Sequence, residues 1–295
     1  MNNKFEKKEF GIITKIEMRY FKMKFIYWTM FFILLLTAAI CLVPALWILT
    51  SGLKDTKEFY EMTIIPRTFQ PEKFVEIWKR FDFKMYYMNS LIQAVGEWAF
   101  CIVFNGLTGY VLSRLKPRGG FLVMSLILLL MMIPNTISMV PLYKTLVKFP
   151  IFNFSLLNTY WPLWLSAGAN CFNILLFKNF FDTISTSLIE AAQIDGYSNL
   201  QIFFKIVIPL SMPIIAVVSI FSFNASWNSF LWPYLVLTKE NLKTVSIFLF
   251  CSQGAGYPAD QYMIMLIFSM LPPIIIFCFM QKQIMGGLSG GAVKG

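Results

Sequence analysis

The chain carries six separate runs of about 20 mainly apolar residues, and these runs limit what it can fold into. A bilayer core about 30 Å thick requires roughly 20 apolar residues of each helix that crosses it. The six predicted spans are Phe25–Leu49, Met88–Leu112, Phe121–Leu142, Thr159–Phe177, Ile206–Leu231 and Tyr262–Met280. The composition agrees, since 57% of the 295 residues are hydrophobic and only 14% are charged. We therefore expect an all-α, multi-pass protein of the plasma membrane.

Six spans place both termini on the same side of the membrane, and basic residues predict which side. Positively charged loops are retained in the cytoplasm. With the termini inside, the inner segments hold 14 basic and 6 acidic residues, and the outer segments hold 11 and 8. Both termini are therefore predicted to be cytoplasmic. The net charge of +10 therefore reflects topology. The lipid bilayer is an expected partner, and nucleic acid is not.

The predicted division of the chain follows from these spans. We expect a cytoplasmic head at 1–24, the first span at 25–50, an extracellular lobe at 51–85, a five-span core at 86–281 and a cytoplasmic tail at 282–295. The first apolar run is longer than the 7–15 residues of a cleaved signal peptide, so it is interpreted as a retained anchor. The apolar segment Thr244–Cys251 is too short to span, and a loop packed on the bundle is favoured over one that dips into a vestibule.

The composition argues against an enzyme. The chain has no histidine, which is the commonest general base and the commonest metal ligand. Its five cysteines show no C-x-x-C spacing, so neither a zinc site nor a disulfide framework is predicted. We expect no catalytic residues, no metal site and no cofactor in this chain.

The cytoplasmic loop between the fourth and fifth predicted spans, at 185–209, holds the most specific motif. Ser187 with Glu190, and Ser198 with Gln201, have the spacing of a capping box, which satisfies the unpaired donors of a first helical turn. Asp195-Gly196 between them is a turn dipeptide. The pattern predicts a short helix, a sharp turn and a second helix that enters the membrane. Small residues in the first helix favour close approach by another protein.

The loop residues Glu190, Ala191, Ala192, Asp195 and Gly196 resemble the E-A-A motif of permease subunits in ATP-binding-cassette importers. Further matches point to the carbohydrate, or maltose-type, branch of that family: Asn89-Ser90-Leu91, Trp227-Asn228-Ser229-Phe230-Leu231-Trp232-Pro233 and the glycine-rich end from Gly286 to Gly295. Ser185 and Ser187 depart from the family pattern, which usually has a proline and an acidic residue there. A different cap is therefore expected at the start of the first helix.

This resemblance implies a type I importer permease fold and a set of partners. The five motif residues would couple the chain to two separate ATPase subunits, which would hold the ATP and Mg²⁺. A second permease would form a heterodimer with this chain, and an extracellular binding protein would deliver the solute, a sugar or oligosaccharide. The chain lacks a G-x-x-x-x-G-K-[ST] phosphate loop, in keeping with ATP hydrolysis on another chain.

Four residues are candidates for the substrate path. Glu97 is the only ionisable residue deep within a predicted span, and such residues usually face a bundle interior or a polar cavity. Asn224 and Asn228 bring amides to the fifth span, and Trp227 lies between them. Alternatives stay open for all four. Hydrogen bonding between helices explains the two asparagines nearly as well, and a partner-facing hydrogen bond or a protonated carboxyl group would explain Glu97. An aromatic belt at the membrane interface would explain Trp227.

Two other classes of function stay open at this point. A stand-alone secondary transporter or channel would be expected to show repeated halves or more buried charges, and no clear internal repeat is present. A membrane enzyme would need a nucleophile or a carboxylate pair within the spans, and neither pattern occurs.

Overall fold

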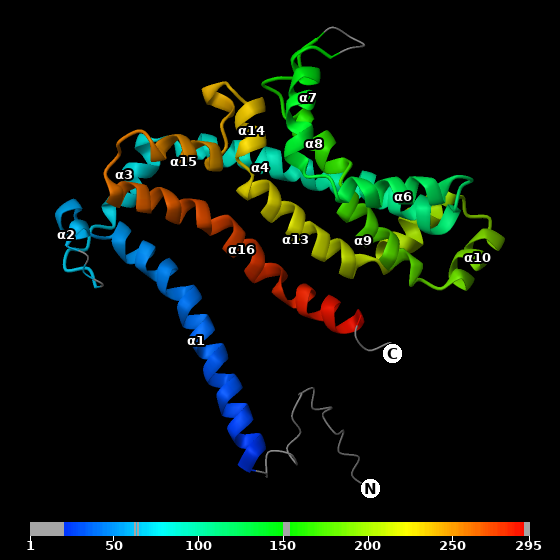
Figure 1. The fold of residues 1–295 in the computed structure, drawn as a ribbon, viewed down its shortest axis with the longest axis horizontal. Helices are drawn as coiled ribbons and strands as arrows, with labels where there is room; N and C mark the ends of the chain where they lie inside the picture. The colour runs from blue at the N-terminus through cyan, green and yellow to red at the C-terminus, as the bar shows by residue number, and fades with distance from the viewer. Residues whose placement is uncertain (1–20, 62, 64, 150–153, 292–295) are drawn as a thin grey trace. The chain divides into compact units, whose positions relative to one another are not determined.

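The computed structural model describes residues 21–61, 63, 65–149 and 154–291, and every regular element among them is a helix. The chain separates into two compact units that divide between Gln70 and Pro71. Most of the predicted head, and the last four residues of the predicted tail, lie outside the described residues. The helices are coloured along the chain in Figure 1.

The first unit consists of α1 (Phe21–Gly52), α2 (Thr56–Tyr60) and the loop that follows. The side chains of α1 are largely exposed and apolar, as a helix surrounded by lipid requires. At 1.5 Å per residue its 32 residues extend about 48 Å, more than enough to cross a bilayer. This confirms a helix at the first predicted span.

A buried carboxylate organises the loop after α2. Glu58 accepts hydrogen bonds from the backbone nitrogens of Arg67 (2.6 Å) and Thr68 (2.9 Å) and from the Thr63 hydroxyl (3.0 Å). Lys54, also buried, donates to the carbonyl of Thr63. Hydrogen bonds from Arg67 and Thr68 outweigh burial and lower the pKa of Glu58 to about 2. The loop is thus closed around an ionised glutamate.

The second unit contains the remaining helices, beginning with α3 (Glu72–Arg80). A continuous helix then runs from Phe83 to Leu115. It comprises α4 (Phe83–Phe100), the π-helical turn η2 (Cys101–Asn105), α5 (Gly106–Tyr110) and a second π-helical turn, η3 (Val111–Leu115). The second predicted span is therefore confirmed as a helix, and it extends beyond both predicted ends.

The third predicted span is interrupted, contrary to a single helix over Phe121–Leu142. It divides into α6 (Gly120–Met131) and α7 (Asn135–Val147). Pro134, which precedes α7, has an extended backbone and no N–H group to continue the ladder of α6. The α7 helix therefore turns away from α6 (Figure 1).

The fourth and fifth predicted spans are interrupted as well. The fourth forms α8 (Trp161–Gly168) and α9 (Cys171–Asp182), with a break at Ala169 and Asn170. In the fifth, the segment α11 (Asn199–Ile202), η4 (Phe203–Val207) and α12 (Ile208–Leu210) meets α13 (Met212–Asn228) at a bend of 81°. Pro213, in the first turn of α13, fits a new helix start better than a helix interior.

The last third of the unit holds four elements: α14 (Leu231–Val236), η5 (Glu240–Leu242), α15 (Val245–Gln253) and α16 (Ala259–Gly291). The segment Thr244–Cys251 is a helix packed on the bundle, since Thr244 caps α15 and Ile247 is fully buried. The sixth predicted span is confirmed within α16. By length and composition, three described helices can cross a membrane, or five when each bent pair counts as one span. The count of six and the orientation of the termini stay predictions.

Two apolar clusters stabilise opposite ends of the second unit. An aromatic cluster joins α3, α4, α15 and α16, and Phe83 is its fully buried centre. A second cluster surrounds Phe177, Phe181 and Phe203 near α10 (Thr186–Ile194). Between them, α13 and α16 lie side by side (Figure 1). One end of the unit is thus built around α3 and α15, and the other around α10.

Candidate functional site: the coupling loop and a polar path

The loop predicted at 185–209 folds as two helices separated by a turn. Its first helix, α10, starts at Thr186 with Ser185 as the N-cap residue. The expected capping box of Ser187 and Glu190 is therefore wrong, because Ser187 already lies inside the helix. The hydroxyl groups of Ser185 and Ser187 instead lie within hydrogen-bond distance of each other, at 2.7 Å. The Ser185 side chain makes no capping hydrogen bond to the first turn of α10.

The end of α10 confirms the predicted turn. Gly196 has a φ of +83°, in the left-handed region that glycine enters without the steric cost of a Cβ atom. The Tyr197 nitrogen donates to the Ala192 carbonyl, and the Gly196 nitrogen donates to the Gln193 carbonyl. This pair of bonds is the Schellman motif, which satisfies carbonyls at a helix end. The motif therefore stops α10 and reverses the chain.

The second helix of the loop starts as predicted. Ser198 accepts a hydrogen bond from the Gln201 nitrogen, and the Gln201 side chain accepts one from the Ser198 nitrogen at 2.8 Å. This reciprocal capping box is confirmed. The chain then passes through the π-helical turn η4 and enters α13 after the bend at Ser211.

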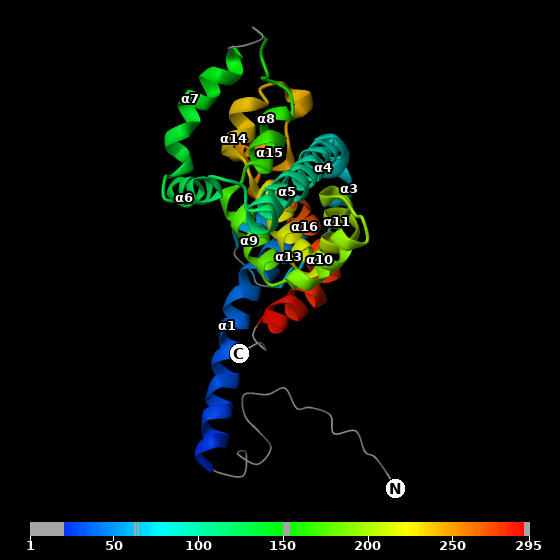
Figure 2. The same ribbon diagram turned by 90° about the vertical axis from the view of Figure 1, so that its right-hand side faces the viewer.

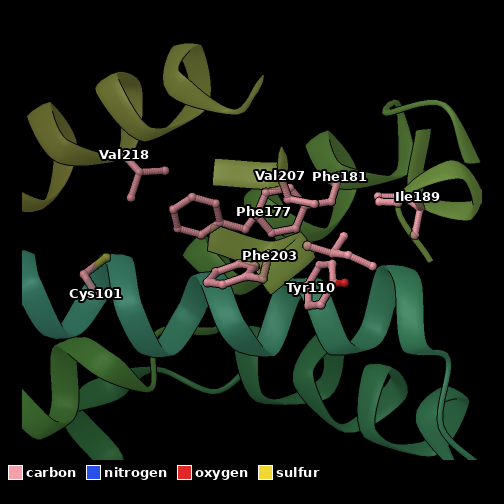
Figure 3. Packing of buried hydrophobic residues seen from close by; sticks show 10 residues of the cluster. Cys101, Tyr110, Phe177, Phe181, Ile189, Phe203, Val207 and Val218 are labelled. Carbon is pink, nitrogen blue, oxygen red and sulfur yellow. The ribbon is translucent and has the colours of Figure 1, made fainter. Parts of the chain in front are cut away.

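The two faces of α10 differ in chemistry. Ile189 and Ala192 are buried and belong to the same apolar cluster as Phe181 and Phe203, and Figure 3 shows Ile189 at the edge of that cluster. Glu190, Ala191, Gln193, Asp195 and Gly196 are exposed, together with Ile194, whose side chain is 86% accessible. Figure 2 views the unit from this end, where α10 and α11 lie close together. The exposed face combines two carboxylates, small residues and an isoleucine, which suits contact with another protein.

An ionic cluster lies at the end of α9, just before α10. Asp182 pairs with Lys178 at 2.7 Å and accepts a hydrogen bond of 2.6 Å from the Ser113 hydroxyl. Burial raises the pKa of Asp182. The hydrogen bonds from Lys178 and Ser113, together with the nearby positive charges, lower the pKa by more than burial raises it. The net pKa lies below the usual range, so this carboxylate stays ionised at neutral pH.

Glu97 lies in a polar contact between α4 and α13. Gln93 donates to the Glu97 carboxylate at 2.9 Å, and the same amide approaches Ser226 at 3.4 Å. Asn224 and Asn228 are exposed one turn apart on α13, and the Asn228 amide donates to the Asn224 side chain at 2.8 Å. Glu97 on α4, and Asn224 and Asn228 on α13, are thus three of the four predicted path residues, and each places a polar group on its helix.

Trp227 has a different environment. Its side chain is 3% accessible and stacks on Phe223, and its indole nitrogen donates to the Ser269 carbonyl of α16 at 2.9 Å. In this structure the indole packs α13 against α16. Its role in a substrate path stays a prediction, as it does for the other three residues.

The span containing Glu97 also carries a polar row that our sequence prediction missed. Side chains that can form hydrogen bonds recur every four residues at Asn89, Gln93, Glu97, Cys101 and Asn105, and the Cys101 sulfur accepts from the Asn105 amide at 3.3 Å. Residues four apart lie on the same face of a helix, so the sequence contained the signal. The row is buried except for the partly accessible Glu97. It therefore indicates a helix that contacts protein along its polar face.

Asn105 has a defined partner at the break between α8 and α9. Its fully buried amide donates to the Ala167 carbonyl at 2.9 Å and accepts from the Asn170 nitrogen at 3.1 Å. Both are backbone groups released by the interruption of the helix. Non-helical backbone is tolerated at membrane depth where protein groups satisfy it. A side chain on one span thereby stabilises the break in another.

Comparison with known proteins agrees with this architecture. Residues 105–288 match the family described as "Binding-protein-dependent transport system inner membrane component", which covers more than half of the chain. The chain belongs to this family. It is an ABC importer permease, and the loop at 185–209 lies inside the matched region.

Several relatives align with nearly the whole permease. A "Probable ABC transporter permease protein YurM" of Bacillus subtilis is 32% identical over 91% of this chain and 88% of that protein. The "Melibiose/raffinose/stachyose import permease protein MelC" of Bacillus subtilis is 31% identical over 86% and 91%, respectively. The "Diacetylchitobiose uptake system permease protein NgcG" of Streptomyces coelicolor is 29% identical over 89% and 87%.

A solved structure shares the fold. It is a chain from a bacterial ABC transporter involved in the import of the acidic polysaccharide alginate, with a TM-score of 0.78 and 22% identity. The match covers 89% of this permease and 98% of that chain. The helical breaks and the loop described above therefore lie within a permease fold that a crystal structure also has.

Proposed function

We propose that this permease forms, with a second permease, the path by which a saccharide enters the cell. One observation carries the proposal: in a chain of this family, α10 has an exposed face that includes Glu190, and Gly196 ends the helix. In this proposal α10 is the coupling helix. Glu190, Ala191, Asp195 and Gly196 form its contact with one of two ATPase subunits, and Ala192 holds the opposite face of α10 against the permease. ATP and Mg²⁺ bind to those subunits, and this chain has no catalytic residues.

The proposed topology has six spans and two cytoplasmic termini, so that α10 lies on the side where ATP is available. The end of the second unit with α3 and α15 then faces outward, where an extracellular binding protein delivers the solute. When ATP binds, the ATPase dimer closes and moves α10. The spans then change from an inward-facing to an outward-facing conformation. A helix that both contacts the ATPase and packs against buried Phe181 and Phe203 is suited to transmit this motion.

The proposed solute class is a sugar or oligosaccharide. Support comes from relatives whose names specify melibiose, raffinose, stachyose or diacetylchitobiose. Within the chain, the path would use Glu97, Asn224 and Asn228. Carboxylate and amide groups can form hydrogen bonds with the hydroxyl groups of a sugar in place of water. Trp227 would support α13 beside these residues.

Copurification tests the assembly. The permease is tagged in its native operon, and the proteins that elute with it are identified for the wild type, Glu190→Arg and Gly196→Asp. We expect an ATPase and a second permease with the wild type and less ATPase with either variant. Isolation of this chain alone, with unchanged yield in both variants, would instead favour a stand-alone secondary transporter. Uptake of radiolabelled raffinose, melibiose and diacetylchitobiose by the same cells then tests the solute class.

A further inference from the structure

The coupling loop is tied to the second predicted span at both of its ends. Before α10, the guanidinium group of Arg114 donates to the carbonyls of Phe181 and Ile184 through one nitrogen, Nη2. After α10, the Tyr110 hydroxyl donates to the Asn199 carbonyl at 3.4 Å. Arg114 and Tyr110 are four residues apart in the continuous helix that ends at Leu115. One helix end therefore contacts both the entry to α10 and its exit.

The Arg114 contact adds charged hydrogen bonds at the end of α9, where the Phe181 carbonyl also accepts a bond of 3.1 Å from the Ile184 nitrogen. The last four carbonyls of a helix have no partner within it, and Phe181 lies in the last turn of α9. A guanidinium group there supplies charged hydrogen bonds and a favourable charge for the negative end of the helix dipole. Ser113 adds its bond to Asp182 beside this contact. The turn from α9 to α10 is thus fixed to the second span by side chains.

Apolar packing connects the same elements. The Tyr110 ring lies 5.1 Å from the Phe203 ring and 6.5 Å from the Phe181 ring, measured between centroids. Ile189 of α10 belongs to the same cluster (Figure 3). A displacement of α10 therefore reaches the second span through both packed rings and hydrogen bonds. Packed clusters of this kind change between discrete arrangements and do not deform gradually.

We propose that Arg114 and Tyr110 are positioning residues that make the helix from Phe83 to Leu115 move with the coupling helix. This inference rests on the proposed function, in which α10 contacts an ATPase. Their hydrogen bonds go to residues before and after α10, so their role is separate from docking by its exposed face. The same helix carries Glu97 and the polar row, so its movement would change access to the proposed path.

Cysteine accessibility in the assembled importer tests this role without a known solute. Asn224→Cys is introduced into a chain whose five native cysteines are replaced, and its labelling by a membrane-impermeant maleimide is measured with and without a non-hydrolysable ATP analogue and Mg²⁺. The analogue is expected to change the labelling rate of the parent importer. Arg114→Met is expected to reduce this response by roughly two- to thirtyfold, the range of reported coupling effects, while the ATPase still copurifies.

Matched variants separate positioning from folding and from charge. Arg118 is exposed in the same cytoplasmic turn, so Arg118→Met removes an equal charge and should leave the response unchanged. Arg114→Lys and Tyr110→Phe alter the donors with little change in bulk, and each should weaken the response even if Arg114→Met fails to assemble. An unchanged response in both conservative variants would overturn the inference. Absence of an ATPase or of any response in the parent importer would instead overturn the proposed function.

Discussion

Two glycines of α5 offer a matched test of how closely the second and fourth predicted spans pack. A Cβ atom at Gly109 would lie 2.8 Å from the Phe177 Cβ atom and 3.0 Å from the Lys178 nitrogen. Ordinary contacts begin near 3.4 Å, and the Lys178 atom belongs to the backbone of α9. At Gly106 the nearest atom would be the ring tip of Phe203, at 3.8 Å. Only Gly109→Ala therefore forces α5 and α9 apart.

The expected magnitude follows from two opposing effects. Alanine is favoured over glycine within a helix by about 1 kcal/mol, and both variants gain this. Overpacking costs about 1–3 kcal/mol, and only Gly109→Ala has this cost. Gly109→Ala should thus be less stable than Gly106→Ala by about 1–3 kcal/mol. At about 2–4 °C per kcal/mol for a chain of this size, the difference in Tm is roughly 2–12 °C.

The assay is the thermal stability of the purified importer, measured as the fraction that remains assembled after heating in detergent. Gly106→Ala should match or exceed the wild type, and Gly109→Ala should lose assembly at a lower temperature. Uptake should fall with Gly109→Ala even at permissive temperature, because α9 leads directly into α10. Equal melting curves for the two variants would refute the close approach of α5 and α9.

Three further predictions concern other parts of the chain. Gly196→Ala should reduce the copurified ATPase by about fivefold or more, since left-handed backbone costs an L-residue roughly 1–2 kcal/mol. The control Gly254→Ala should have no effect, because Gly254 has a negative φ and open space around it. The loop around Glu58 should be stable above its ordinary pKa of 4.5 and lose stability as the pH falls towards 2. Hydrogen exchange of residues 65–70, corrected for the intrinsic rate, should show this acid dependence, and Glu58→Gln should abolish it. Lys73 pairs with fully buried Asp260 at 2.5 Å, so Lys73→Met should destabilise the importer by about 3–5 kcal/mol, and adding Asp260→Leu should restore part of the loss in Tm.

Sequence signals that act over a few residues predicted most of the local structure of the loop at 185–209. Gly196 ends α10, and Ser198 with Gln201 starts the next helix, because each interaction involves neighbours in the chain. The start of α10 was misplaced by two residues, since two serines and two threonines lie there and each can serve as a cap. Choice among them depends on the turn from α9, which Arg114 holds from a distant part of the chain.

The breaks within the spans could not be predicted from the residues next to them in the sequence. Apolar runs predicted continuous helices, and prolines alone did not distinguish a kink from a break. The break at Asn170 contains no proline, and it is stabilised by Asn105, 65 residues away. The bend at Ser211 likewise separates two helices that composition had merged. The polar row on the second span could have been predicted, because its four-residue spacing is visible in the sequence.

The docking of α10 on an ATPase is the central claim, and protection of single cysteines measures it most directly. In a chain without its native cysteines, Gln193→Cys lies on the exposed face of α10 and Ala192→Cys on the buried face. We predict that maleimide labels Gln193→Cys rapidly in the isolated permease and slowly in the assembled importer, while Ala192→Cys reacts slowly in both. Equally rapid labelling of Gln193→Cys with and without the ATPase would contradict the account.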